Sequence, residues 1–237
     1  MQWHRVAAIL GSVACLCAAA TDWAYAQPAQ PRSDINSVFL DPEFDAWVAR
    51  FERHGREVYD RRHDIVAVTG VKPGMVVADI GAGTGLFTRL FATRVGASGK
   101  VYAVDISAAF VHNITRISRA QGQTNVTGVV NSQTGAGLAP QSLDLAFICD
   151  TYHHFDYPAA MMQSIRAALK PGGSVVVVDF RRIPGFSSSW VMGHVRADEA
   201  AVIGEIEASG FRLVEDRDFL RTNYFLRFVP VEGSTTR

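Results

Sequence analysis

The chain has 237 residues, and its 23 basic and 23 acidic side chains give a formal net charge of +0 at pH 7. This balance provides no electrostatic footprint for nucleic acid or for an anionic membrane, so neither is expected as a partner. Of the three cysteines only Cys149 lies beyond residue 26, which excludes an intramolecular disulfide in the rest of the chain and leaves the fold to its hydrophobic core.

The first 26 residues have the pattern of a cleaved export signal. Residues 6–20 are almost entirely apolar, and Ala24-Tyr25-Ala26 supplies the small residues that a signal peptidase prefers. An apolar stretch of about fifteen residues is shorter than the roughly 20 needed to span a bilayer. We therefore predict a signal peptide over residues 1–26 and a mature protein exported to the periplasm without stable membrane insertion. A lipoprotein processed at Cys15 and a buried N-terminal helix are the alternatives.

The rest of the chain is expected to hold a lead-in and one domain. Residues 27–40 contain two prolines and mostly polar side chains, which predicts a flexible lead-in, and residues 41–237 are expected to form the domain. Asp41-Pro42-Glu43 resembles a helix start, with an acid as N-cap and proline at the first helical position. Apolar residues follow at helical spacing, and a second helix is predicted over residues 56–68.

Beyond residue 74 strands and helices are expected to alternate. The predicted strands cover residues 75–80, 101–104, 126–130, 143–149, 175–180, 211–215 and 224–231. The predicted helices begin at Leu86, after a Ser107 cap, at Asp156 and at Arg196. Continuous apolar strands joined by helices predict a parallel sheet covered on both faces. The last two strands have no room for a crossover helix between them and are expected to be antiparallel.

A glycine-rich turn follows the first predicted strand. Asp79 lies near the end of that strand, and glycines occupy positions 81, 83 and 85 before the helix that opens at Leu86. Glycines allow a tight turn and let a ligand lie against the backbone. Asp105 ends the second strand, where doubly wound folds hydrogen-bond a ribose. The pattern therefore predicts a nucleoside-binding site.

The spacing of the turn argues against a dinucleotide. A dinucleotide motif would place its third glycine at position 86, which is Leu86. The carboxylate of Asp79 would repel a pyrophosphate but suits the cationic ammonium group of an amino-acid ligand. Residues 79–85, Asp-Ile-Gly-Ala-Gly-Thr-Gly, resemble the first motif of the class I S-adenosylmethionine (SAM) methyltransferases. Residues 138–144, 150–155 and 166–173 resemble later segments of that family, so that the resemblance covers residues 57 to about 231.

The resemblance implies a Rossmann-like methyltransferase fold, with a mostly parallel seven-stranded sheet ending in an antiparallel hairpin, and SAM as cofactor. It assigns Asp79 and Gly81 to the methionine part, Asp105 to the ribose hydroxyls, and Ile106 with residues 131–133 to the adenine. The expected cofactor-binding residues are Asp79, Gly81, Ala82, Gly83, Gly85, Asp105, Ile106, Asn131 and Ser132. Many relatives carry an acid where this chain has Asn131-Ser132-Gln133, so an amide or hydroxyl would contact the adenine here.

The expected catalytic residues follow the fourth strand. His153 and His154 lie in the loop that faces the acceptor, histidine titrates near neutral pH, and Asp150 is expected to orient one of the two rings. A structural role for both histidines is the alternative. A metal site formed by these three residues is not expected, because neighbours on one loop rarely converge on a metal without a distant third ligand.

The function that the resemblance implies is transfer of a methyl group from SAM to a small-molecule acceptor. The alternative from another class is a periplasmic protein that binds SAM or a nucleoside without catalysis. An NAD-dependent oxidoreductase is disfavoured by Leu86.

Overall fold

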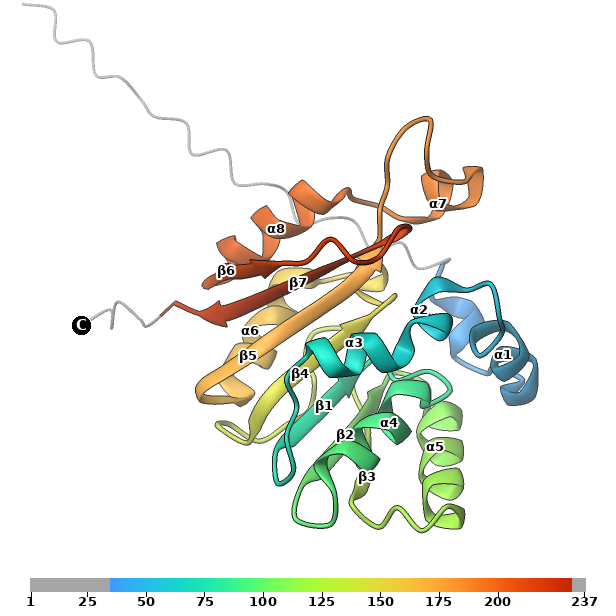
Figure 1. Ribbon diagram of the computed structural model, residues 1–237, viewed down its shortest axis with the longest axis vertical. Coiled ribbons are helices and arrows are strands. Elements are labelled where there is room, and N and C mark those ends of the chain that lie inside the picture. Colours follow the sequence, from blue (N-terminus) through green and yellow to red (C-terminus); the bar gives the residue numbers. More distant parts are fainter. Residues whose placement is uncertain (1–34, 232–237) are drawn as a thin grey trace, which may run out of the picture.

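Seven strands form one sheet in the order β3-β2-β1-β4-β5-β7-β6 in the computed structural model, which describes residues 35–231 (Figure 1). The strands are β1 (Val76–Ile80), β2 (Lys100–Asp105), β3 (Val126–Val130), β4 (Leu143–Cys149), β5 (Leu169–Phe180), β6 (Phe211–Asp216) and β7 (Asn223–Pro230). Strands β1 to β5 are parallel, while β7 runs antiparallel to both β5 and β6. This arrangement confirms the predicted Rossmann-like sheet with its antiparallel hairpin. The predicted signal peptide lies outside the described residues.

Helices connect the strands and precede the first of them. The α-helices are α1 (Phe44–Phe51), α2 (Glu57–Asp60), α3 (Arg62–Val68), α4 (Leu86–Val95), α5 (Ala108–Ala120), α6 (Pro158–Ala168), α7 (Ser189–His194) and α8 (Glu199–Ala208), and two 3-10 turns are η1 (Ser37–Phe39) and η2 (Tyr152–His154). The cap of α5 is the predicted one, since the Ser107 hydroxyl accepts a hydrogen bond from the Phe110 backbone N–H. None of the helices within residues 35–231 is long and apolar enough to cross a membrane.

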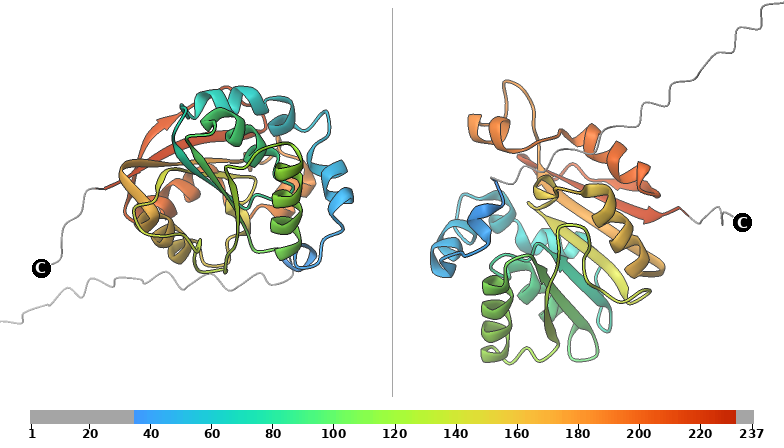
Figure 2. Two further views of the ribbon diagram at one scale, coloured as in Figure 1. Left: turned by 90° about the horizontal axis from the view of Figure 1, so that it is seen from below. Right: turned by 180° about the vertical axis from the view of Figure 1, so that it is seen from behind.

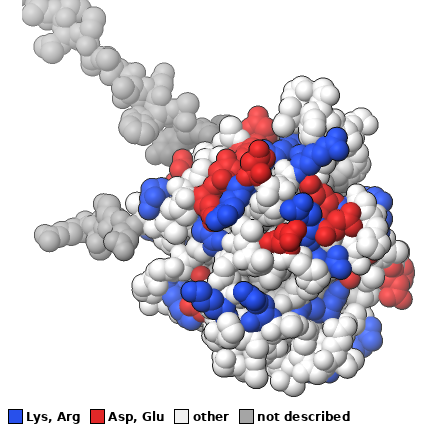
Figure 3. Space-filling view, in the orientation of Figure 1, with Lys and Arg blue, Asp and Glu red and all other residues white. Residues whose placement is uncertain are grey.

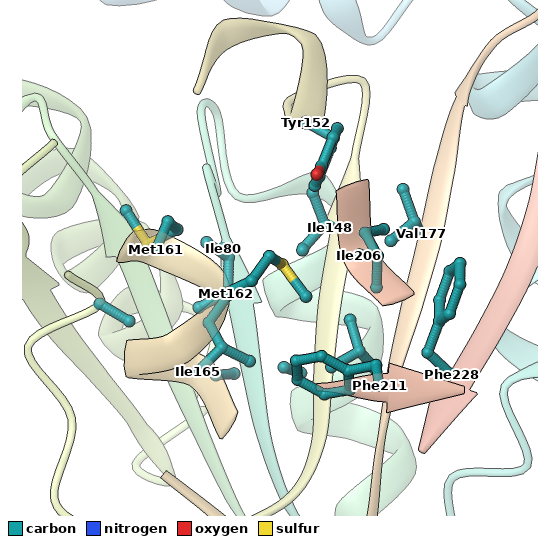
Figure 4. Close-up of a cluster of buried hydrophobic side chains, with 14 of the residues drawn as sticks. Ile80, Ile148, Tyr152, Met161, Met162, Ile165, Val177, Ile206, Phe211 and Phe228 are labelled. Atoms are coloured by element: carbon teal, nitrogen blue, oxygen red, sulfur yellow. The ribbon is translucent and has the colours of Figure 1, made fainter. Parts of the chain in front are cut away.

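The sheet separates two hydrophobic layers. Side chains of α3 and α4 pack on one face, and side chains of α6 and α8 pack on the other (Figure 2). On the second face, Met162 and Ile165 of α6 point toward Ile148 of β4 and Ile206 of α8 (Figure 4). Each of these four side chains is buried, and burying an aliphatic side chain stabilises the fold by about 1.5–3 kcal/mol. These two layers hold the strand ends in fixed positions.

The strand order reverses between β1 and β4. The chain runs outward from β1 to β2 and β3, then returns to β4 on the other side of β1. Open α/β sheets bind ligands at the carboxyl ends of the strands at such a point. Helices α1, α2 and α7 lie beyond that same end of the sheet (Figure 1). The candidate site therefore has walls from both the beginning and the end of the described chain.

Several predicted boundaries differ from the structure for local reasons. The first helix begins at Phe44 instead of Pro42, because the Glu43 carboxylate accepts a hydrogen bond from Ala46 N and serves as N-cap. The predicted helix over residues 56–68 is divided at Arg61, whose backbone leaves the helical region. The predicted helix over residues 196–209 begins at Glu199, because Asp198 caps it through Ala201 N. Helix α7 was not predicted.

Four hydrogen bonds connect α2 to the segment that precedes β7. The carboxylate of Glu57 accepts hydrogen bonds from the backbone N–H groups of Arg221, Thr222 and Asn223 and from the Thr222 hydroxyl, at 2.6–3.1 Å. Burial favours the neutral acid, but these hydrogen bonds lower the pKa of Glu57 below its ordinary value. The connection before β7 is therefore fixed to the N-terminal helices.

Acidic and basic side chains alternate over the molecular surface in the view of Figure 3. Neither sign forms a field that covers this face, in agreement with the equal numbers of acidic and basic residues in the chain.

Candidate active site

A pocket of about 1020 Å³ opens at the carboxyl ends of the parallel strands. Of the residues expected from the sequence to form the site, Asp79, Gly81, Ala82, Gly83, Asp105, Ile106, Asn131, Ser132, Asp150, His153 and His154 all line it. Gly85 does not line the pocket; it is the N-cap of α4, with φ +79°. The structure thus brings residues from four strand ends into one cavity.

The glycine turn is held by β2 and by its own backbone. The N–H groups of Gly81 and Ala82 both donate to the carbonyl oxygen of Val104, at 2.8 and 3.0 Å. Gly81 and Gly83 have φ values of +72° and +54°, in the left-handed region that favours glycine. The turn therefore presents the backbone of Gly81 and Gly83 to the pocket, beside the small side chains of Ala82 and Thr84.

Asp105 is buried beside the turn. Its Oδ2 accepts a hydrogen bond from Gly83 N at 2.8 Å, and its Oδ1 accepts one from Ser107 N at 2.9 Å. Burial raises its pKa to about 6, although these hydrogen bonds act to lower it. Each carboxylate oxygen retains a second acceptor site, which is what a pair of ribose hydroxyl groups requires.

Asp79 is a second buried carboxylate of the pocket. Its Oδ2 accepts a hydrogen bond from the Thr88 hydroxyl at 2.6 Å. Burial raises its pKa to about 7, and the charge of Asp105 adds to the increase. A cationic ligand would favour the ionised forms of both acids, so the pair fits a ligand that carries an ammonium or a sulfonium group.

The raised pKa of Asp79 predicts how the stability of the ligand-free protein depends on pH. Between 3.8, the ordinary pKa of an aspartate side chain, and the folded pKa of about 7, the folded state holds a proton that the unfolded state releases. The free energy of unfolding contributed by Asp79 is therefore fully present below pH 3.8 and lost as the pH rises through 7. We expect Asp79→Asn to gain stability relative to the wild type over this interval in urea unfolding. Parallel pH profiles for the two proteins would contradict the assignment.

The glycines of the turn are expected to respond differently to substitution. A Cβ at Gly81 would lie 2.2 Å from the Thr151 side chain, whereas a Cβ at Gly83 would meet Phe51 of α1 at 3.5 Å. We expect Gly81→Ala to lower the melting temperature strongly. Gly83→Ala should cost about 1–2 kcal/mol for its left-handed backbone and should chiefly abolish cofactor binding, because its methyl group occupies ligand space. Calorimetry and thermal melts measure the two effects separately; a Gly83→Ala protein that binds SAM normally would contradict this role.

Asn131 and Ser132 follow β3 and line the pocket. The Asn131 N–H donates to the Asp105 carbonyl oxygen, and its side-chain NH₂ donates to the Ser132 carbonyl oxygen. The Oδ1 atom of Asn131 is buried without a hydrogen-bond partner among the described residues. A buried acceptor without a partner is costly, and the exocyclic amino group of an adenine could satisfy it.

Asp150 does not orient a histidine, contrary to the expectation from the sequence. Its Oδ2 accepts a hydrogen bond from Arg56 Nη2 at 2.6 Å, and its Oδ1 accepts one from Asn223 Nδ2 at 2.7 Å. The residue has φ +48°, which directs the chain out of β4. Asp150 thus connects the N-terminal helices to β7, and its carboxylate is occupied by these two partners.

Asp179, at the end of β5, takes the place expected for Asp150. Its Oδ1 lies 2.8 Å from His153 Nδ1, and its Oδ2 accepts a hydrogen bond from the His153 N–H. Both side chains are almost completely buried. Because a carboxylate only accepts, the proton of this contact lies on Nδ1, and the Nε2 atom of His153 keeps its lone pair.

Two further residues surround the paired histidines. His154 Nδ1 lies 3.0 Å from Asn36 Oδ1, and His154 Nε2 lies 3.4 Å from His194 Nε2 of α7. Burial, with the neighbouring rings of His153 and His194, lowers the pKa of His154 to about 2. The ring of His154 is therefore uncharged and a weak base at neutral pH.

Sequence reasoning missed Asp179 and Asn36, and it considered His194 at the border of the acceptor pocket only as an alternative to a capping or salt-bridging role. Asp179 had a usable signal, since it ends a parallel strand beside β4 and therefore lies at the same edge as the paired histidines. His194 belongs to the unpredicted helix α7, and Asn36 belongs to the expected lead-in. Neither has a sequence pattern that would place it at the site.

Aromatic side chains from the N-terminal segment cover the pocket. Phe39 of η1 packs against Trp47 of α1 and, edge-on, against His154, with ring centroids 4.9 and 5.2 Å apart. Trp47 in turn contacts Phe51, and all three aromatic residues line the pocket. The part of the expected lead-in that the structure describes is thus packed on the site. The cavity wall near the histidines is aromatic and apolar.

Comparisons with known proteins agree with this geometry. Residues 77–173 match a family described as "Methyltransferase domain". The ubiquinone/menaquinone biosynthesis C-methyltransferase UbiE of Hydrogenovibrio crunogenus is 30% identical over 124 residues, covering 52% of this chain and 48% of that protein. The protein of the same name from Bordetella avium is 28% identical over 161 residues, covering 63% of this chain and 62% of that protein. The chain therefore spans about half to three fifths of these relatives.

The fold is also found in solved structures. A SAM-dependent methyltransferase from Aquifex aeolicus has a TM-score of 0.71 and 21% sequence identity, covering 78% of this chain and 98% of that chain. Residues 77–173 thus match a methyltransferase domain, and the fold of the described residues is that of a solved SAM-dependent methyltransferase. The two buried acids, the glycine-rich turn and the Asn131 oxygen without a partner are groups that could hold SAM.

Proposed function

We propose that this chain transfers a methyl group from SAM to a small acceptor bound beside the histidines. The observation that carries the proposal is that two buried acids, Asp79 and Asp105, line one cavity together with the glycine-rich turn. Asp105 would accept hydrogen bonds from the ribose hydroxyls, Asp79 would face the ammonium group, and Asn131 would receive the adenine amino group. The sulfonium methyl would then point toward the aromatic part of the pocket.

The proposed reaction is a direct displacement. The acceptor donates an electron pair and forms a bond to the methyl carbon of SAM. The carbon–sulfur bond breaks, sulfur keeps the electron pair of that bond, and S-adenosylhomocysteine is the leaving group. Because the sulfonium already activates the methyl group, alignment supplies most of the rate enhancement. An acceptor proton would pass to Nε2 of His153, whose imidazole is oriented by Asp179 in the manner of a histidine–aspartate dyad. The apolar walls favour an acceptor with an aromatic or aliphatic body.

Binding and turnover test the proposal in sequence. Calorimetry with SAM and with S-adenosylhomocysteine should show one site per chain, and labelled SAM incubated with small-molecule extracts should yield a methylated product. Binding without any stoichiometric product would favour the alternative, a non-catalytic SAM-binding protein. The absence of heat with both ligands, together with binding of NAD, would overturn the cofactor assignment as well.

We also propose that the protein is exported, with cleavage after Ala26. The support is the apolar stretch over residues 6–20 followed by Ala24-Tyr25-Ala26. Mass spectrometry of the protein from its native host is expected to find Gln27 at the N-terminus, in the periplasmic fraction. A chain that retains Met1 in the cytosolic fraction would contradict export.

A further inference from the structure

Three histidine rings from two distant segments converge in the pocket. One ring nitrogen from each of His153, His154 and His194 lies within 4.8 Å of the corresponding nitrogens of the other two. His153 and His154 come from η2 after β4, whereas His194 ends α7, 40 residues beyond His154 in the chain. The distant third residue that the sequence did not reveal is therefore present.

The hydrogen bonds on the outer side of the rings determine which nitrogens face inward. Asn36 Nδ2 donates to the His154 carbonyl oxygen and to Asp156 Oδ2, so the amide oxygen of Asn36 must be the atom that faces His154 Nδ1. His154 Nδ1 therefore carries the proton, as His153 Nδ1 does toward Asp179. In neutral imidazole, the form that binds metals, both histidines therefore direct the lone pair of Nε2 away from these partners.

We infer that His153, His154 and His194 bind a divalent first-row transition metal of the zinc type, with an open coordination position toward the pocket. Zinc–nitrogen distances of about 2.0–2.1 Å place two ligand nitrogens of a tetrahedral site about 3.4 Å apart. The Nε2 atoms of His154 and His194 are separated by 3.4 Å. The other ligand nitrogens lie within 4.8 Å of one another, and rotation of the rings on metal binding would bring them to this separation.

The surroundings of the cluster match those of metal-binding histidines in general. Such histidines donate their outer N–H to a carboxylate or to another oxygen acceptor, which fixes the ring and raises its basicity. Asp179 plays this part for His153 and Asn36 for His154. The ring of His194 stacks on the ring of Trp190, with the ring centroids 4.4 Å apart and the ring planes at 20°. Oxygen acceptors thus orient His153 and His154, and Trp190 packs against the ring of His194.

Three histidines leave one position of a tetrahedral metal for water or substrate. All three line the same pocket as Asp79 and Asp105, so an acceptor with an oxygen or nitrogen donor could occupy that position. A bound cation would lower the pKa of a coordinated hydroxyl and would then replace His153 as the means of activating the acceptor. The activation of an acceptor by the cation rests on the proposed methyl transfer, whereas the binding of the cation to the three histidines does not.

The test measures metal binding without SAM or acceptor. The chain from residue 27, prepared without a histidine tag and treated with EDTA, is titrated with Zn²⁺ in a calorimeter, and Co²⁺ is added separately for its visible absorption. We expect one equivalent of Zn²⁺ with a Kd below about 10 μM. His194→Phe, which keeps an aromatic ring against Trp190, should raise the Kd at least tenfold. His63→Ala, on the exposed side of α3, should leave it unchanged.

Several outcomes would overturn the inference. These are binding of less than half an equivalent, equal affinity in His194→Phe and His63→Ala, or a Co²⁺ spectrum typical of an octahedral aquo ion. If His194→Phe melts below the wild type, His154→Gln supplies the same comparison from the other segment. Asp105→Ala should retain full Zn²⁺ affinity while losing SAM, so a failure of the cofactor assignment and a failure of the metal assignment are distinguishable.

Discussion

Replacing His153 by alanine is expected to lower the turnover number about 10²–10⁴-fold, the usual contribution of a positioned base. The SAM affinity should be preserved, because His153 is bonded to Asp179 and not to the glycine turn or to Asp105. Loss of kcat without loss of cofactor binding is the pattern of an interaction made in the transition state. Steady-state kinetics and calorimetry on the same preparation measure both quantities.

Two variants make this expectation specific. Asp179→Asn keeps the size of the side chain but removes the carboxylate that orients His153, so turnover should fall while the fold is retained. His112→Ala, on the exposed side of α5, serves as the histidine control. Near-normal turnover in both His153→Ala and His154→Ala would mean that the acceptor needs no activation at the cluster and that alignment alone drives transfer.

Asp105→Ala is expected to weaken SAM binding at least about tenfold, because two charge-assisted hydrogen bonds to the ribose, worth roughly 1.5–3 kcal/mol each, are lost. Asp105 also accepts from Gly83 N and Ser107 N, so the substitution loosens the turn as well. Asp105→Asn is the milder companion, because it retains one acceptor oxygen. Calorimetric titration with S-adenosylhomocysteine measures the affinities.

The control for this prediction is an exposed acid. Asp45 lies on the outer side of α1, and Asp45→Ala removes the same charge without touching the pocket. An Asp105→Ala protein that binds the cofactor as tightly as Asp45→Ala would contradict the ribose assignment. A protein that loses binding only because it unfolds would be recognised by its thermal melt.

The sheet could be predicted because its signals are local. The apolar stretch at residues 143–149 matches the buried strand β4 residue for residue, since buried strands need nearly continuous apolar side chains. Residues 126–130 match β3 residue for residue as well, although β3 lies at the edge of the sheet and is only partly buried. The antiparallel hairpin followed from the length of one connection. Helix α7 was missed because its six residues are too few for a helical period to be recognised.

The sequence could predict only those site residues that lie at the carboxyl ends of predicted strands. Asp79, Asp105 and Asn131 could be located because the carboxyl ends of parallel strands share one edge. The partners of His154 come from a turn before α1 and from the end of α7, and their positions are set by tertiary packing. The prediction that Asp150 orients a histidine is wrong because residues close in sequence need not be in contact, and the carboxylate that contacts His153 is Asp179 of β5.

The contact of Glu57 with the segment before β7 has a consequence for the order in which the molecule is assembled. A nascent chain that has not yet reached residue 221 lacks the donors for Glu57 and the Asn223 amide that binds Asp150. The wall that α2 contributes to the pocket therefore becomes fixed only when the last hairpin pairs with β5. Residues 221–223 must therefore be synthesised before the cofactor cavity can close, so a truncated chain that ends before β7 is expected to fail to bind the cofactor even though every residue of the glycine turn is present.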